Sequence, residues 1–217
     1  MLTRCCAPLL LVGLVLLARP AEHAAAQALP GSEVRTSVYG IDAQGQKFVY
    51  VFDRSASMGN GANTPLAAAK RELLASLENL GPSQQFQIIF YNEKPTIFAI
   101  SGLVGRLVFG TERNKAAARE FIEGITAEGG TEHYLALETA LRLDGDVIFF
   151  LTDADQPGLS AGELERLSQR NQHAIIHAIE FGEGAKPPGE NFLAQLAAQN
   201  RGQYVYLEVA RLVERGK

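Results

Sequence analysis

The chain has 217 residues, 47% of them hydrophobic, which is enough to bury the core of one sizeable domain. Its formal net charge of −4 and the scatter of its basic residues argue against a nucleic-acid partner, which would favour a basic patch. Both cysteines, Cys5 and Cys6, lie within the first 28 residues, so the rest of the chain is expected to fold without a disulfide framework.

Residues 1–28 have the parts of a secretory signal peptide. Arg4 supplies positive charge, residues 9–18 form an apolar run, and residues 26–28 form a small-x-small cleavage site. We therefore expect cleavage after Ala28 and a secreted or periplasmic protein, without a membrane span once the signal is removed. An apolar run of ten residues is too short for a stable membrane-spanning helix, but retention as an N-terminal anchor stays open as the alternative.

The remaining chain reads as one domain at residues 47–209, between a linker at 29–46 and a C-terminal tail at 210–217. The linker is polar, is broken by glycine and proline, and includes a short edge strand at residues 34–39. Apolar runs and turn signals predict six strands, at residues 47–53, 85–91, 96–100, 147–152, 174–181 and 203–208. Helical periodicity and capping residues predict helices at residues 65–80, 112–124, 132–143, 161–171 and 190–200.

This alternation of strands and helices predicts an α/β fold of the Rossmann-like, doubly wound type. Its six-stranded sheet is mostly parallel and has helices on both faces. Only four residues, 92–95, separate the second strand from the third, which is too few for a crossover helix. The third strand is therefore expected to be antiparallel, at one edge of the sheet. Ligands of such folds bind at the carboxyl ends of the strands, near a switch point in strand order.

Three separated fragments carry the chemistry of the chain. The run Asp53-Arg54-Ser55-Ala56-Ser57 follows the first long strand, Gly129-Gly130-Thr131 precedes a predicted helix, and Leu151-Thr152-Asp153 ends the fourth strand. Their carboxylates and hydroxyls are hard oxygen donors, which suit a small divalent cation such as Mg²⁺. The first fragment alone is a weak signal, but the three fragments in this order and structural context are a strong one.

The set resembles the metal-ion-dependent adhesion site (MIDAS) of von Willebrand factor type A (vWA) domains, which reads DxSxS, then T, then D. The resemblance covers residues 47–209 and implies that strands 47–53 and 147–152 are neighbours. It implies Ser55, Ser57 and Thr131 as direct or switchable ligands of Mg²⁺, with Mn²⁺ or Ca²⁺ as alternatives. Asp53 and Asp153 would act largely through bound water. It further implies a monomeric binding module rather than an enzyme, whose protein ligand presents an exposed Asp or Glu.

The chain departs from the family pattern at two places. Ala56 stands where the family often has glycine, and residues 154–157 replace the usual glycine after Asp153. Asp155 could add negative charge beside the cation, but a solvated loop residue is the favoured interpretation. These departures bear on the affinity for an acidic ligand more than on metal binding.

Two other functions stay open. Metal-dependent phosphoryl transfer on a Rossmann-like fold would need a second carboxylate two residues after Asp53, where the chain has Ser55. A structural scaffold with a decayed metal site is the second alternative. Neither Gly-x-Ser-x-Gly nor a Walker phosphate loop occurs in the sequence. Glu180, near a predicted strand end, is interpreted as a solvated terminus rather than a catalytic acid.

Other polar residues are given structural roles. His133 is interpreted as a surface residue at the rim of the site. His173 and His177 are four apart, which suits a metal pair only on a helix, and here they lie in or beside a predicted strand. Asp144 and Asp146 flank a glycine before a strand, so we expect them to stabilise a turn.

Overall fold

The computed structural model describes residues 34–100, 105–154 and 157–214. A seven-stranded sheet has the order β5-β4-β3-β7-β8-β9, with β6 also paired to β4. Its strands are β3 (Lys47–Asp53), β4 (Gln85–Tyr91), β5 (Pro95–Ile97), β6 (Val108–Phe109), β7 (Val147–Thr152), β8 (Ile175–Gly182) and β9 (Tyr204–Glu208). The helices are α1 (Pro65–Glu78), α2 (Glu112–Gly124), α3 (His133–Leu141), α4 (Ala161–Arg170), α5 (Phe192–Gln199) and α6 (Val209–Glu214), and a short 3₁₀ turn, η1, covers Ala56–Met58.

The predicted fold class is confirmed. Strands β4, β3, β7, β8 and β9 run parallel, while β5 and β6 pair antiparallel with β4 at its outer side. The parallel strands at the centre are almost continuously apolar because both of their faces are covered. The two-residue strand β6 was not predicted, since so short a segment is recognisable only through its pairing with β4.

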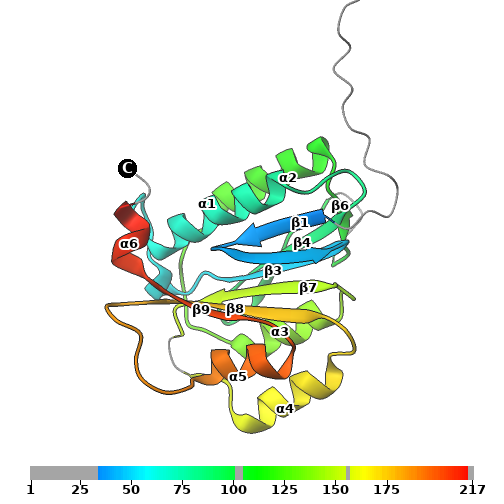
Figure 1. Cartoon of the computed structure of the whole chain (residues 1–217). Coiled ribbons are helices and arrows are strands. Elements are labelled where there is room, and N and C mark those ends of the chain that lie inside the picture. Colours follow the sequence, from blue (N-terminus) through cyan, green and yellow to red (C-terminus); the bar gives the residue numbers. More distant parts are fainter. Residues whose placement is uncertain (1–33, 101–104, 155–156, 215–217) are drawn as a thin grey trace, which may run out of the picture.

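Helices cover both faces of the sheet (Figure 1). Helices α1 and α2 pack on one face, against side chains that include Tyr50 and Phe52. Helices α3, α4 and α5 pack on the other face, against side chains that include Val51 and Phe150. Successive residues of β3 therefore enter opposite cores, as the alternation of side chains along a strand requires.

The order of the strands creates a switch point beside β3. The chain goes from β3 through α1 to β4 on one side and later returns to β7 on the other side, with Phe52 opposite Leu151. Connections that leave neighbouring strands in opposite directions open a crevice at their carboxyl ends. Asp53 ends β3 and Asp153 follows β7, so both carboxylates stand at this crevice.

Two segments differ from their sequence-based assignment. Within the predicted linker, β1 (Val34–Val38) and β2 (Ile41–Gly45) form a separate antiparallel hairpin rather than an edge strand followed by a turn. Val38 and Ile41 are buried in the core on the α1 side. Tyr39 and Gly40 both have positive φ at the turn, a geometry that matches the twist of two-residue hairpins. At the other end, α6 continues to Glu214, where a tail was expected from residue 210.

The predicted signal peptide at residues 1–28 and the residue Asp155 lie outside the described residues. Across the part of the chain that is described, no helix combines the length and the apolar character needed to cross a membrane.

Candidate metal site

Asp53 is the most deeply placed residue of the predicted site. Its side chain is fully buried at the end of β3. The backbone N–H of Ser55 donates to Oδ1 at 2.7 Å, and the hydroxyl of Thr152 donates to Oδ2 at 2.6 Å. Each carboxylate oxygen therefore has one fixed donor and keeps a further lone pair for another donor or a cation.

The electrostatic surroundings of Asp53 disfavour its charge in the absence of a cation. Burial raises the pKa of Asp53 to about 6, against the opposing effect of hydrogen bonds from Thr152 and Ser55, and the nearby charge of Asp153 raises the pKa further. The ion pairs among the described residues do not include Asp53. A buried carboxylate beside a second carboxylate is a setting that a bound cation would stabilise.

The two serines follow Asp53 in a tight turn. Ser55 precedes the 3₁₀ turn η1, and its Oγ lies 3.1 Å from the Oγ of Ser57. Ser55 is buried and Ser57 is exposed, so the hydroxyl pair leads from the buried carboxylate to the surface. Met58 is fully buried at the end of the turn and anchors it to the core.

The loop that carries Thr131 lies against the loop that carries the serines. The backbone N–H of Ala56 donates to the carbonyl of Gly129 at 3.0 Å, and the N–H of Glu128 donates to the carbonyl of Arg54 at 2.9 Å. Thr131 follows Gly129 by two residues and is partly exposed. The structure thus brings the Gly-Gly-Thr loop and the Asp-x-Ser-x-Ser loop together.

Asn60 is a residue of the site region that the sequence analysis missed. Its side chain donates to the carbonyl of Ala127 at 2.9 Å and accepts from the N–H of Ala127 at 2.8 Å. This two-point contact joins the segment after the serines to the loop before Thr131. An asparagine between two glycines reads as a turn residue, and its long-range partner has no signal in the sequence.

Gly129, two residues before Thr131, has to be a glycine because of its neighbours. Gly129 has φ of +75°, and a Cβ at this position would lie 2.5 Å from Oε2 of Glu93 and 2.9 Å from Nδ2 of Asn92. The adjacent Gly130 N–H donates to Oε1 of Glu93 at 2.5 Å, and Asn92 Nδ2 donates to the Glu128 carbonyl at 2.9 Å. The segment after β4 therefore fixes the Gly-Gly-Thr loop from the outside.

Asp153 stands on the third loop of the site. It is partly exposed directly after β7, and the chain turns at Ala154, which has φ of +57°. The Ala154 N–H donates to the Thr152 hydroxyl at 3.1 Å, so Thr152 links the turn after β7 to the Asp53 carboxylate. The five predicted ligands lie at the end of β3, in η1 or in loops, all at the carboxyl ends of the parallel strands, and their role as ligands stays a prediction.

Two residues near the site were interpreted wrongly. His133 is 2% exposed, not a surface residue; its Nδ1 lies 3.0 Å from the hydroxyl of Tyr91. The residues three, four and seven positions later, which include Ala136 and Leu137, are also buried, so helical spacing could have indicated this. Glu180 is 7% exposed, not a solvated terminus. Its position beside Thr152 in the sheet explains its burial.

No group of three or more His, Cys, Asp or Glu residues suited to a metal ion occurs among the described residues. His177 lies in β8 and accepts a hydrogen bond from the N–H of Gln203 at 3.1 Å. The described part of the chain therefore offers the hydroxyl-rich edge as its candidate for a cation.

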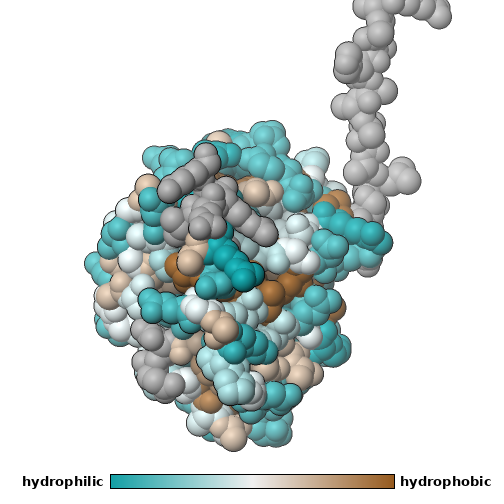
Figure 2. Space-filling model, turned by 60° about the vertical axis from the view of Figure 1, so that its left-hand side comes forward, coloured by the Kyte–Doolittle hydropathy of each residue, from teal (hydrophilic) through white to brown (hydrophobic). Residues whose placement is uncertain are grey.

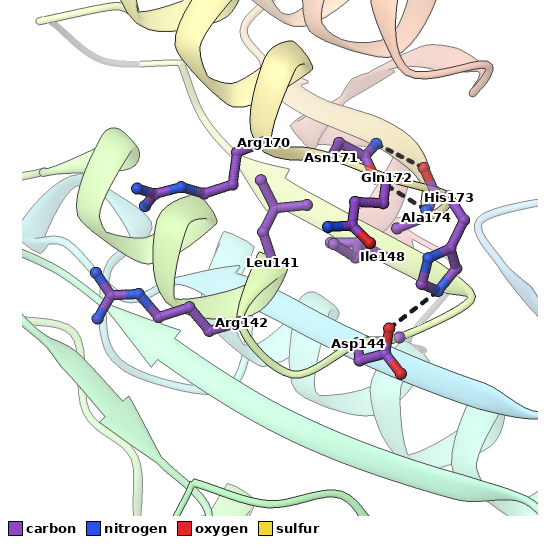
Figure 3. Close-up of a pocket in the computed structure, with 10 residues that line it drawn as sticks. Leu141, Arg142, Asp144, Ile148, Arg170, Asn171, Gln172, His173 and Ala174 are labelled. Carbon is purple, nitrogen blue, oxygen red and sulfur yellow. Dashed lines mark hydrogen bonds and ion pairs between the residues drawn. The ribbon is translucent and has the colours of Figure 1, made fainter.

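A cavity of about 320 Å³ opens at the amino ends of the parallel strands, away from the candidate site (Figure 3). Its ionisable side chains already have partners: His173 lies 3.4 Å from Asp144, and Arg142 and Arg170 both contact Glu138. Among the described residues at this end, no carboxylate is buried as Asp53 is. In Figure 2 the molecule is turned so that the carboxyl ends of the strands come forward, and hydrophilic residues surround small hydrophobic areas there.

Comparison with known proteins identifies the family of the chain. A family model described as von Willebrand factor type A domain matches residues 48–156, which is more than half of the chain. The chain belongs to the von Willebrand factor type A domain family. Proteins of this family are generally non-enzymatic, and the vWA domain is typically a metal-dependent protein-interaction module. A search of curated proteins finds no match.

Solved structures show the same fold. A von Willebrand factor type A protein from Catenulispora acidiphila is 22% identical, with a TM-score of 0.66 over 86% of this chain and 45% of that chain. BatB from Bacteroides thetaiotaomicron is 16% identical, with a TM-score of 0.56 over 79% of this chain and 98% of that one. Proximal thread matrix protein 1 from the mussel byssus, with a zinc-occupied MIDAS motif, is 22% identical, with a TM-score of 0.52 over 78% and 44%. The chain thus spans less than half of the Catenulispora and mussel chains.

Proposed function

We propose that this vWA domain holds a divalent cation at a complete MIDAS and uses it to bind an acidic side chain of a protein ligand. The cation would be held by Asp53, Ser55, Ser57, Thr131 and Asp153. The observation that carries the proposal is the buried Asp53 carboxylate, fixed by Ser55 and Thr152 beside a hydroxyl pair that reaches the surface.

The donor set favours a hard cation. Its members are carboxylate and hydroxyl oxygens, which Mg²⁺, Mn²⁺ and Ca²⁺ accept and which soft metals do not prefer. Mg²⁺ is the first choice because it commonly keeps several waters and few protein carboxylates. The zinc-occupied motif of the mussel protein makes Zn²⁺ the comparison ion.

The chain's residues have separate tasks in this proposal. Asp53 supplies buried negative charge, while Ser55, Ser57 and Thr131 are neutral donors that leave the cation electron-poor. When bound, the cation supplies a coordination position for an incoming carboxylate. Asn60 and Glu93 hold the Gly-Gly-Thr loop so that the hydroxyl of Thr131 stays at the rim.

Isothermal titration calorimetry with Mg²⁺, Mn²⁺, Ca²⁺ and Zn²⁺ tests cation binding. Asp53→Asn should abolish uptake, while the matched variant Asp146→Asn, at the opposite edge, should retain it. Uptake by both variants, or by neither, would contradict the assignment. N-acetylglutamate N-methylamide, added with and without Mg²⁺, then serves as the carboxylate probe, and its binding should require the cation.

We further propose that the protein acts outside the cytoplasm as a monomer. The N-terminal residues support export, because a positive residue, an apolar run and a small-x-small site occur in order. N-terminal sequencing of the full-length chain, recovered from the extracellular or periplasmic fraction, should begin at Leu29. A chain that begins at Met1 in the membrane fraction would instead favour the retained anchor.

A further inference from the structure

Glu180 lines a cavity that adjoins the proposed metal site. The cavity has a volume of about 260 Å³, and its walls include Ala154, Pro187, Phe192 and Tyr204. Glu180 lies on β8, where it is paired with Thr152 of β7. Its side chain is more than nine-tenths buried, so a carboxylate has been taken out of water beside this cavity.

The partners of this carboxylate are neutral. The side-chain amide of Asn191 and the hydroxyl of Tyr204 both donate to Oε2, each at 2.5 Å. Among the described residues, no hydrogen bond reaches Oε1 and no ion pair includes Glu180. Neutral donors compensate a buried negative charge less completely than a cation does. The carboxylate is therefore able to bind a positively charged group that enters the cavity.

One ammonium group already lies beside the lining of the cavity. Nζ of Lys186 lies 4.4 Å from the ring centroid of Tyr204, a cation–π contact on the ring whose hydroxyl bonds Glu180. Lys186 belongs to the same cavity wall as Pro187 and Glu190. It shows that the aromatic wall attracts a cation, and its positive charge would repel a second cation.

The cavity and the metal site are close enough for one partner to reach both. Thr152 is the neighbour of Glu180 in the sheet and donates its hydroxyl to Asp53. Neighbouring strands lie about 4.8 Å apart, so Glu180 on β8 and Asp53 on β3 are separated by about 10 Å across the sheet. A short segment of a protein ligand spans such a distance.

We propose that Glu180, with Tyr204 and Phe192, forms a subsite for a lysine or arginine side chain of the ligand whose acidic side chain is bound at the metal site. The pairing of the two sites depends on the proposed function, but the cation subsite itself does not. The ligand would therefore present one acidic and one basic side chain on the same surface, and the basic one would select among acidic partners.

The subsite is tested with a single-residue probe. N-acetylarginine N-methylamide is titrated into the ¹⁵N-labelled protein in the presence of a chelator, and the uncharged citrulline analogue is the control. The arginine probe should shift the amide signals of Glu180, Tyr204 and Phe192 to saturation, and the citrulline probe should not. Equal shifts from both probes, or shifts elsewhere on the molecule, would overturn the proposal.

Two variants with opposite expected effects sharpen the test. Glu180→Gln keeps an oxygen that can accept from Asn191 and Tyr204. It should lower the affinity for the arginine probe at least tenfold because the charge-assisted contact is lost. Lys186→Gln removes the competing charge and should strengthen the probe about threefold. Thermal unfolding shows whether each variant is folded. A folded Glu180→Gln protein with unchanged affinity would overturn the assignment.

The metal site and the subsite are separated by a third measurement. In the Asp53→Asn protein the arginine probe should bind as before, while Mg²⁺ uptake is lost. A peptide with one glutamate and one arginine should then bind the unmodified protein more tightly with Mg²⁺ than with chelator. Broadening of the Glu180 signal by Mn²⁺ in the Asp53→Asn protein would mean that the cavity holds a metal ion, which would contradict the proposal.

Discussion

Asp53 lies at the carboxyl ends of the parallel strands, which we call the carboxyl edge of the sheet, and Asp146 lies at their amino ends, the amino edge. The surroundings of the two residues differ. Asp146, just before β7, receives the backbone N–H groups of Gln46 and Lys47 on one oxygen, at 2.8 and 2.9 Å. Asp53, at the end of β3, receives one N–H and one hydroxyl on separate oxygens and is fully buried beside serine hydroxyls. An aspartate at a strand end is thus a turn stabiliser in one setting and a candidate ligand in the other.

The charges of the two edges differ in the same way. At the amino edge, Asp144 pairs with Lys47 at 3.0 Å and with His173 at 3.4 Å. At the carboxyl edge, Asp53 and Glu180 form no ion pair with described residues. Ion pairs at a surface contribute little to stability beyond local order. Buried carboxylates without a cationic partner favour the binding of a cation. The carboxyl edge is therefore the edge that we expect to bind ligands.

The largest expected difference between the two edges is in how the free energy of unfolding depends on pH. The pKa of Asp53 is raised from 3.8 to about 6 by burial, so the folded protein binds this proton more tightly than the unfolded chain does. Without a cation, the stability linked to Asp53 is fully present below about pH 4 and is lost as pH rises through about 6, a change of about 3 kcal/mol. Urea unfolding in chelator at pH 4–8 measures this change.

The Asp53→Asn variant removes this contribution, so the difference between the two unfolding curves isolates it from other groups. Asp146→Asn should leave the same pH dependence in place. Added Mg²⁺ should restore stability above about pH 6, where Asp53 is ionised. A difference curve that is flat between pH 4 and 6 would mean that Asp53 is not the destabilising group that its burial indicates.

The next largest effect concerns Asp146 itself. Asp146→Ala removes the acceptor of two backbone N–H groups and should lower the free energy of unfolding by about 2 kcal/mol. Because this turn is at the opposite edge from the site, cation affinity should change less than about twofold in calorimetry, a ratio worth under 0.5 kcal/mol. A large loss of affinity in this variant would show that the two edges are coupled.

Asn60→Ala should have a smaller effect on stability and should act at the site edge. Loss of both hydrogen bonds to Ala127 is expected to cost about 1–2 kcal/mol in the free energy of unfolding. It should also weaken Mg²⁺ binding several-fold, since the loop before Thr131 is no longer tied to the serine loop. Asn114→Ala, which removes a surface side-chain contact to the Phe109 carbonyl at the far side of the sheet, is the matched control. Equal cation affinity in both variants would separate Asn60 from the site.

The sequence predicted the parts of the molecule whose residues interact locally. The apolar runs of β3, β4 and β7 are clear, and the Ser-x-x-Glu pattern of Ser160 and Glu163 at the start of α4 forms the reciprocal hydrogen bonds of a capping box. The order of the three site fragments, two at strand ends and one before a helix, was sufficient to place the candidate site at the carboxyl ends of the strands. These features depend on neighbours within a few residues or on the alternation of whole elements.

What the sequence did not predict depends on distant contacts. The hairpin of β1 and β2 turns at Tyr39, whose positive φ is unusual for a tyrosine, and its burial depends on α1. The burial of His133 and Glu180 is determined by Tyr91 and by the neighbouring strand β7. The contact of Asn60 with Ala127 joins residues 67 positions apart. Polar residues in such places look like surface residues until the fold is known.

The smallest expected effect on the cation distinguishes Thr131 from Asp53. Thr131 is partly exposed on a loop that is positioned by Gly129 and Glu93, whereas Asp53 is buried in the sheet. If the Thr131 hydroxyl contacts the cation mainly when a carboxylate is bound, Thr131→Ala should change Mg²⁺ affinity less than about threefold. It should lower the affinity for N-acetylglutamate N-methylamide about tenfold, which is about 1.4 kcal/mol of binding free energy.

Thr131→Ser is the control, because it keeps the hydroxyl while removing the methyl group, and it should retain most of the affinity for the carboxylate probe. Both affinities are measured on the same samples, with Mg²⁺ followed by calorimetry and the probe by NMR titration at saturating Mg²⁺. Equal weakening of cation and probe in Thr131→Ala would mean that the hydroxyl is a permanent ligand. In that case Thr131 would belong with Asp53 in the fixed part of the site.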